Sequence, residues 1–335
     1  MRIRNIDFEG NPLFLAPMED VTDPSFRYMC KRFGADMVYT EFVSSDGLIR
    51  DAYKSLEKLK INDNERPVGI QIYGHLIEPM VEAAKIAEQS NPELIDINFG
   101  CPVKKIATRG AGSGMMKEPD KMVEMTRQIV NAVKIPVTVK TRLGWDENSL
   151  IIPELAERLQ DVGIAALTIH GRTRSQLYKG EADWTLIGEV KRNQRIHIPI
   201  IGNGDVNSPE GAKECFEKYG VDAVMIGRAT YGRPWIFRTI KHYLEKGELL
   251  PEPDVDERVT IAKLHFAKSV EVKGEKVGVL EMRRHLSSYF KGLYDFKETR
   301  LKLVTENNPE KVLQLLDYIK ERWGNGNDGK GKCDE

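Results

Sequence analysis

Short apolar segments alternate with longer amphipathic segments along most of the chain. The apolar segments are rich in β-branched residues and end in glycine, proline or a polar residue, as strands buried on both faces of a sheet do. They span residues 13–16, 37–42, 68–72, 94–97, 137–140, 166–169, 198–201 and 223–226. The pattern predicts eight buried strands.

The segments between these strands have helical periodicity. Residues 119–130 begin with Pro119, which suits a first helical position, and place Met122, Met125 and Ile129 on one face. Strand–helix alternation repeated eight times favours a closed parallel barrel over an open sheet, and such barrels take roughly 250 residues. We therefore expect an α/β fold, a (β/α)₈ TIM barrel over residues 1–248.

The pattern changes after Leu250. Residues 251–254 read Pro-Glu-Pro-Asp, which is typical of a linker, and residues 257–322 show amphipathic helices without another strand. This predicts a C-terminal all-α helical domain over residues 254–323. The final segment, 324–335, is rich in Gly, Asn, Lys and Asp, and we expect it to be a disordered tail.

Composition is that of an ordinary soluble protein. Hydrophobic residues make up 41% and charged residues 30%, with a net charge of −1. The four cysteines form no Cys-x-x-Cys pair, so neither a zinc site nor a disulfide framework is indicated. The first residues lack a signal-type apolar run, and no stretch approaches the ~20 apolar residues that span a bilayer. We expect a cytoplasmic protein with no metal and no membrane contact.

Polar and reactive residues follow the predicted strands. Barrel enzymes build their active sites at the carboxyl ends of the strands. The residues at those positions are Pro17, Met18, Glu41, Gln71, Asn98, Cys101, Lys140, Arg142, His170, Arg172, Asn203, Gly204, Asp205, Gly227 and Arg228. A structural core would not need these residue types there, so the pattern indicates an enzyme.

The last two strand ends indicate a phosphate site. Gly204 and Gly227 allow backbone N–H groups to approach an anion, and Arg228 adds a charged contact. Ordinary βα turns are the alternative for each segment taken alone. Residues 110–114, Gly-Ala-Gly-Ser-Gly, do not complete a dinucleotide fingerprint, because Met115 stands at the third glycine position. We expect a mobile loop over the site there, with a plain surface loop as the alternative.

Cys101 is the candidate proton donor. It follows the fourth strand between Gly100 and Pro102, and no acidic residue lies between it and Lys117. We expect an accessible thiol whose pKa is low or normal, which suits a general acid. The alternative is a small buried hydrophobe. Lys140 at a strand end suggests an anionic partner, whereas His170 has a scaffold role as its alternative.

Several motifs together resemble the tRNA-dihydrouridine synthases, closest to their bacterial B-type branch. They lie at residues 16–18 with 21–23, 96–102, 110–113, 139–142, 169–174, 201–205, 225–228, 282–285 and 289–292. The resemblance covers about residues 10–295. Glu19 and Asp20 depart from the small residues common in the family after Pro-Met, and Arg233 stands where an Asn often precedes Pro-Trp.

The resemblance implies an FMN enzyme that uses NADPH, or NADH, to reduce uridine in tRNA to 5,6-dihydrouridine. Cys101 would protonate C5 of uracil while the flavin delivers hydride to C6. Residues implied in cofactor binding are Pro17, Met18, Glu19, Gln71, Lys140, His170, Asn203, Gly204, Asp205, Gly227 and Arg228. Those expected at the substrate are Asn98, Arg142, Arg172, Arg283 and Arg284.

A tRNA substrate needs a second contact surface. Residues 263–302 hold ten Lys or Arg and five Asp or Glu, a local charge of +5. Lys268, Lys273, Lys276, Arg283, Arg284, Lys291 and Arg300 are candidates for phosphate contact, and a solvated helical face is the alternative.

Two other functions remain open from the sequence. One is an FMN oxidoreductase acting on a free pyrimidine-like small molecule. The other is a tRNA-binding or folding-assistance protein without catalysis. For the tRNA enzyme, position 17 of the D-loop is the expected target. Nothing in the sequence calls for an obligate protein partner, and we expect a monomer.

Overall fold

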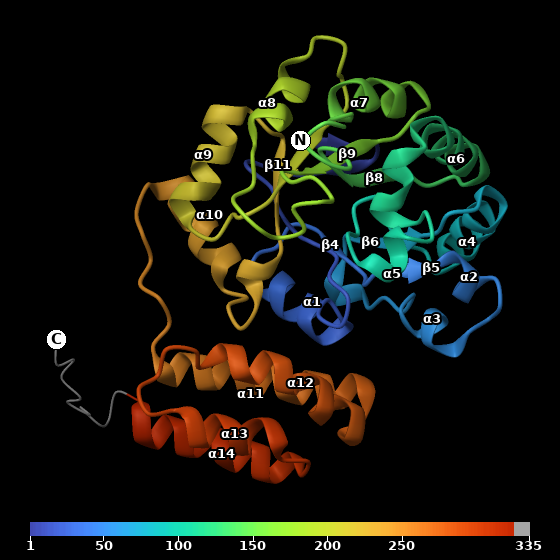
Figure 1. Cartoon of the computed structure of the whole chain (residues 1–335). Helices are drawn as coiled ribbons and strands as arrows, with labels where there is room; N and C mark the ends of the chain where they lie inside the picture. The colour runs from blue at the N-terminus through green and yellow to red at the C-terminus, as the bar shows by residue number, and fades with distance from the viewer. Residues whose placement is uncertain (325–335) are drawn as a thin grey trace.

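The computed structural model describes residues 1–324, and its central feature is a barrel of parallel strands (Figure 1). The order around the barrel is β3-β11-β10-β9-β8-β7-β6-β4. A parallel bridge between Phe14 and Met37 closes the ring. The strands are β3 (Leu13–Leu15), β4 (Val38–Tyr39), β6 (Val68–Tyr73), β7 (Leu94–Asn98), β8 (Val137–Arg142), β9 (Ala166–His170), β10 (Ile200–Asn203) and β11 (Ala223–Ile226). The predicted (β/α)₈ barrel is confirmed.

Helices cover the outside of the barrel. The longer ones are α1 (Pro24–Arg32), α4 (Ile77–Gln89), α6 (Pro119–Ala132), α7 (Ile152–Asp161), α8 (Thr185–Arg192), α9 (Pro209–Tyr219) and α10 (Ile236–Lys246). Short elements between them are β5 (Val43–Ser44), α2 (Ser45–Leu48), α3 (Tyr53–Glu57), η1 (Asp63–Glu65), α5 (Lys104–Ala107), η2 (Gly112–Lys117) and η3 (Arg228–Thr230). A hairpin of β1 (Arg2–Ile3) and β2 (Ile6–Asp7) precedes the barrel. The apolar faces of these helices and the strands form one large core.

The second predicted strand is interrupted. β4 ends at Tyr39, and pairing with β6 resumes only in β5. The side chain of Phe42 in the gap lines the cavity described below. The interruption therefore turns a barrel strand into part of the site wall.

Four further helices pack beside the barrel: α11 (Val255–Lys273), α12 (Glu275–Tyr289), α13 (Lys297–Thr305) and α14 (Pro309–Trp323). In Figure 1 they lie below the barrel, with α11 and α12 next to α1. Their apolar core includes Met29 and Trp235 from the barrel. The helical part and the barrel thus share buried surface. The tail predicted over residues 324–335 lies outside the described residues except for Gly324.

None of the helices in residues 1–324 is both long enough and apolar enough to cross a membrane.

Candidate active site

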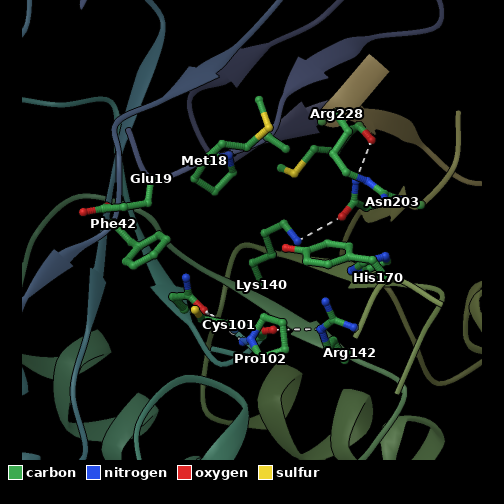
Figure 2. A pocket seen from close by; sticks show the side chains of 18 of the residues that line it. Met18, Glu19, Phe42, Cys101, Pro102, Lys140, Arg142, His170, Asn203 and Arg228 are labelled. Atoms are coloured by element: carbon green, nitrogen blue, oxygen red, sulfur yellow. Dashed lines mark hydrogen bonds between the residues drawn. The ribbon is translucent and has the colours of Figure 1, made fainter. Parts of the chain in front are cut away.

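A cavity of about 570 Å³ opens at the carboxyl ends of the barrel strands. This volume is within the range of cofactor and ligand pockets. Every residue predicted from the sequence to hold the cofactor lines it, as do Cys101, Asn98 and Arg142. Figure 2 shows Lys140, His170, Asn203 and Arg228 gathered on one wall, with Cys101 and Pro102 on another. The cavity therefore brings the candidate proton donor together with the candidate cofactor residues.

Lys140 supplies a buried cation to this cavity. Its Nζ donates to Oδ1 of Asn203 over 3.0 Å, and Nδ2 of Asn203 donates to the backbone oxygen of Met225 over 2.8 Å. Burial lowers the pKa of Lys140 to about 8, with Arg142 adding to the effect. The lysine is therefore held in place by a residue of β10, which is separated from β8 by β9.

Asp205 contacts two arginine side chains, Arg172 and Arg228, next to the glycine-containing turns that follow β10 and β11. Its carboxylate accepts from Nη1 of Arg172 at 2.9 Å and from Nη2 of Arg228 at 3.0 Å. Burial would raise the pKa of Asp205, but its hydrogen bonds from Arg172 and the backbone of Ala182 lower it. Asp205 therefore holds the guanidinium group of Arg228 in place at the cavity wall.

Two glycines of this wall, Gly204 and Gly227, differ in what an added side chain would contact. Gly204 has a φ of +130°, and an added Cβ would lie 2.7 Å from Cβ of Ala182. At Gly227 an added Cβ would lie 3.5 Å from Ala16 and 3.6 Å from Met18, both of which line the cavity. A side chain at position 227 would thus occupy space within the cavity wall. Gly204 is therefore required by its backbone conformation and by Ala182, whereas the absence of a side chain at Gly227 keeps the cavity wall open.

His170 is held neutral. Burial lowers the pKa of its imidazole well below the usual value, and the cations Arg142, Lys140, Arg172 and Arg228 lower it further. Nε2 of His170 lies 3.4 Å from Nη1 of Arg172. Because arginine can only donate, Nε2 is the acceptor and Nδ1 carries the proton. His170 can therefore donate one hydrogen bond to a ligand.

The Cys101 thiol is more buried, and its pKa is higher, than the sequence predicted. Its residue is only 6% exposed, and burial raises the pKa of its thiol. The backbone N–H of Val103, Arg142 and Lys140 act in the opposite direction. The expected low or normal pKa was therefore wrong, because exposed Lys104 and Lys105 do not compensate for the loss of solvent around the sulfur.

The segment 110–114 is also not the mobile or surface loop that was expected. Gly112 begins the 3₁₀ helix η2, and residues 112–116 are buried. Ser113 donates to the backbone oxygen of Cys101 from both its hydroxyl, at 2.8 Å, and its N–H, at 3.1 Å. The segment supports the Cys101 turn from behind.

Three predicted substrate residues, Arg172, Arg283 and Arg284, lie outside the cavity lining, and the first two have partners within the protein. Arg172 is buried and donates to Asp205 and to the backbone oxygens of Lys179 and Gly180. Arg283 donates to the backbone of Thr305 and to Oδ1 of Asn307, which joins α12 to the segment before α14. These two guanidinium groups have structural partners.

The candidate phosphate-contact residues of the helical part include both covered residues with protein partners and exposed residues. Lys273 is buried in an ion pair with Asp23, at 2.5 Å. Arg284 is about half exposed and donates to the backbone oxygen of Asp20 at 2.5 Å. Lys276, Lys291 and Arg300 are exposed, whereas Lys268 is mostly covered and pairs with Glu271. Arg284 thus brings positive charge from α12 to the loop that begins at the cavity edge.

Besides Phe42, two aromatic residues of the cavity were missed from the sequence. Tyr178 is about half exposed and lies over the guanidinium groups of Arg142, at 5.6 Å, and Arg228, at 4.7 Å. Tyr231 also lines the cavity. Neither follows a strand directly, so the strand-end rule that found the other residues did not reach them.

Glu19 lines the cavity and pairs with Lys58, which also lies 3.8 Å from Glu41. The departure from the small residue common at this position therefore places a neutralised carboxylate at the edge of the cavity. Arg233, the second departure, pairs with Glu252 away from the cavity lining.

Comparison with known proteins gives one family. The model of the family described as "Dihydrouridine synthase (Dus)" matches residues 14–322. The chain is 39% identical to the "Probable tRNA-dihydrouridine synthase" of Rickettsia conorii, over 96% of this chain and 98% of that protein. It is 43% identical to "tRNA-dihydrouridine synthase B" of Pseudomonas putida, over 93% and 92% respectively.

Among solved structures, a 2-naphthoyl-CoA reductase in complex with 2-naphthoyl-CoA is similar with a TM-score of 0.57 and 12% identity. The match covers 95% of this chain and 57% of that protein, so this chain spans little more than half of its length. At this identity the similarity supports the barrel fold alone.

Proposed function

Because the chain belongs to the dihydrouridine synthase family, in its bacterial B-type branch, we propose that it reduces uridines of the tRNA D-loop to 5,6-dihydrouridine. The relatives match over nearly their whole length and carry this activity in their names, which supports tRNA uridine reduction as the general function. The finer proposals are FMN as cofactor, Cys101 as proton donor, a cytoplasmic location and position 17 as the target.

The cavity fits FMN. Its volume suffices for a ring system with a phosphate-bearing chain, and Lys140 offers a buried cation that needs an anionic partner. Gly204, Gly227 and Arg228 would hold the phosphate, and His170 would donate from Nδ1. Bound FMN, reduced by NADPH or NADH, would supply the hydride for C6 of the uracil.

Cys101 supplies the proton for the same reduction. Its raised pKa keeps the thiol protonated at neutral pH, so it can donate to C5 of uracil. The thiolate left behind is stabilised by the N–H of Val103 and by the charge of Arg142 and Lys140. Hydride at C6 and a proton at C5 together give 5,6-dihydrouridine. Solvent then returns the proton to the sulfur.

The single observation that carries this proposal is that Cys101 lines the same cavity as Lys140, His170 and Arg228. A uracil base must leave its stack to reach such a cavity, as bases do in other base-modifying enzymes. Arg284 at the Asp20 loop gives a positive contact for the RNA outside the cavity.

The test is the dihydrouridine content of tRNA in cells that lack this protein. Loss at position 17, restored by the wild-type gene, is the expected result. Unchanged content at every site would refute the proposal. The purified protein should also be yellow, and its flavin absorbance should bleach when NADPH is added without oxygen. A bleaching that tRNA does not reverse, but a free pyrimidine does, would favour a small-molecule substrate.

A further inference from the structure

A chain of buried polar side chains runs beneath the Cys101 turn, across β8, β7 and β6. Oγ1 of Thr138 donates to Oδ1 of Asp96 at 2.6 Å, and Nε2 of Gln71 donates to Oδ2 of Asp96 at 2.6 Å. Nδ2 of Asn98 donates to Oε1 of Gln71 at 2.8 Å. Asp96 is 1% exposed and Gln71 is fully buried, so water does not compete for these groups.

The chain ends on the backbone of the proton-donor turn. Oδ1 of Asn98 accepts from the N–H of Gly100 at 3.0 Å and from the N–H of Cys101 at 2.9 Å. These two N–H groups point into the protein and need an acceptor. The Asn98 amide can satisfy them only with its oxygen facing the turn.

The direction of the chain is reinforced at its other end. An ionised carboxylate only accepts hydrogen bonds, so Gln71 must turn its NH₂ group toward Asp96. Its oxygen then faces Asn98, which must turn its own NH₂ group toward Gln71. The oxygen of Asn98 is left facing Gly100 and Cys101. The backbone N–H groups of Gly100 and Cys101 can only donate and the Asp96 carboxylate can only accept, so the two ends of the chain impose the same direction.

We propose that Asp96 is a positioning residue, whose carboxylate anchors the Gln71 amide as an acceptor-only partner and, through Gln71 and Asn98, holds the Cys101 turn in place. Asp96 does not line the cavity and acts only through these neighbours. The catalytic meaning of the proposal rests on the proposed role of Cys101, whereas the hydrogen-bond chain does not.

A carboxylate is a costly residue at this position. Burial raises the pKa of Asp96 to about 6, although the hydrogen bonds from Gln71 and Thr138 and the charge of Lys140 oppose the rise. An asparagine would avoid the burial of charge, but it would replace the charge-assisted hydrogen bonds from Gln71 and Thr138 with weaker neutral ones, and its own NH₂ group could also face Gln71. The cost is explained if the site requires a firm, acceptor-only anchor.

The first test compares Asp96→Asn with Thr138→Val, which removes a hydrogen bond to the same carboxylate but keeps it acceptor-only. Alkylation of Cys101 by iodoacetamide is followed from pH 7 to 10 by peptide mass spectrometry, which separates it from the other cysteines.

In Asp96→Asn the turn should loosen, alkylation should become faster and the thiol pKa should move down toward its ordinary value. Dihydrouridine formation should slow by roughly 10²-fold. Thr138→Val should match the wild type at the alkaline end of this range, where Asp96 is ionised although it has lost a hydrogen bond that lowers its pKa. An Asp96→Asn profile identical to wild type would overturn the proposal.

A swap of the two groups gives a test that does not depend on one variant folding well. Asn98→Asp alone places acceptor-only carboxylates at both ends of Gln71, so the amide oxygen of Gln71 must face one of them. In the double variant D96N/N98D the chain runs in reverse, and the carboxylate at position 98 still accepts from Gly100 and Cys101. The melting temperature and Cys101 alkylation profile of the double variant should return toward wild type from those of Asn98→Asp.

A double variant that is no more stable than Asn98→Asp, or that does not fold, would contradict the proposal. These readouts use no uridine reduction, so they separate the two proposals. If they behave as expected while tRNA reduction survives without Cys101, only the proposed catalytic role fails. If they do not, while tRNA reduction depends on Cys101, only the role of Asp96 fails.

Discussion

Single residues of the cavity show how burial sets their charge. Lys140 has its pKa lowered to about 8, His170 is neutral, and Cys101 keeps its proton. Desolvation is the first cause in all three, and neighbouring charges then add or oppose. The ionic state of the site therefore depends on its depth in the barrel.

Lys140→Met should weaken FMN binding by roughly 10- to 100-fold at pH 7, since a charge-assisted contact is lost. In the wild-type apoprotein Lys140 loses its proton as pH rises through about 8, so FMN affinity should fall between pH 7 and 9. The variant should lack this dependence. Flavin fluorescence titration measures both. The exposed Lys105→Met is the control, and a wild-type slope in Lys140→Met would contradict the assignment.

The positions of these residues could be predicted from the sequence, but their ionisation could not. Each follows a strand-like segment, so the barrel rule places Lys140, His170 and Cys101 at one opening. The burial of Cys101 depends instead on η2, which does not directly follow a strand and begins well after the end of β7. Its low exposure could not be read from the local sequence.

At the scale of elements, η2 is the support of the proton-donor turn. Gly112 has a φ of +55°, and an added Cβ would lie 3.0 Å from the backbone oxygen of Cys101 and 3.1 Å from its Cβ. Gly110 also has a positive φ, of +78°, but its added Cβ meets only His75, at 3.8 Å. The two glycines share a left-handed backbone conformation and differ in the contact with Cys101.

Gly112→Ala and Gly110→Ala form a matched pair. Both should cost the roughly 1–2 kcal/mol of a left-handed non-glycine residue. Only Gly112→Ala should also displace the Cys101 turn and slow dihydrouridine formation. Thermal unfolding and single-turnover kinetics measure the two effects. Equal rates in the two variants would show that η2 does not position the thiol.

Periodicity predicted the elements well where their residues are buried on both faces. The predicted strand at residues 37–42 was too long, because the chain leaves the sheet after Tyr39 and Phe42 lines the cavity. The buried 3₁₀ helix at 112–117 was missed, because its glycines are typical of loops and its packing partner is the distant Cys101 turn. Local sequence does not record such contacts.

At the scale of the whole molecule, a buried polar cluster joins the helical part to the barrel. Lys273 pairs with Asp23, the N-cap residue of α1, and with Glu281. His265 contacts Ser25 at 3.4 Å and Tyr289 at 3.1 Å, and the ring of His285 lies 4.6 Å from that of Phe26. The helical pattern of residues 257–322 predicted the helices. It did not predict that Lys273 would form an ion pair with Asp23 of the barrel.

The cluster should make stability depend on pH. Burial, with Lys273 and Arg284 nearby, lowers the pKa of His285 to about 4 despite the attraction of Asp23. The unfolded chain therefore binds a proton at higher pH than the folded one, and stability falls as pH drops from about 6.5 toward 4. His285→Phe should reduce this loss by up to about 3 kcal/mol. Urea unfolding at pH 7 and 4.5 measures it, and an unchanged pH dependence in the variant would contradict the assignment.

The proposed function depends above all on the Cys101 thiol as the proton donor in uridine reduction. Its most direct test is a single turnover of Cys101→Ala, with the flavin reduced first and tRNA then added. Flavin reduction by NADPH should proceed as in wild type, whereas dihydrouridine formation should fall by about 10²- to 10⁴-fold. Cys215→Ala, at a buried cysteine of α9, is the control and should keep its rate. Dihydrouridine formed by Cys101→Ala at the wild-type rate would contradict the account.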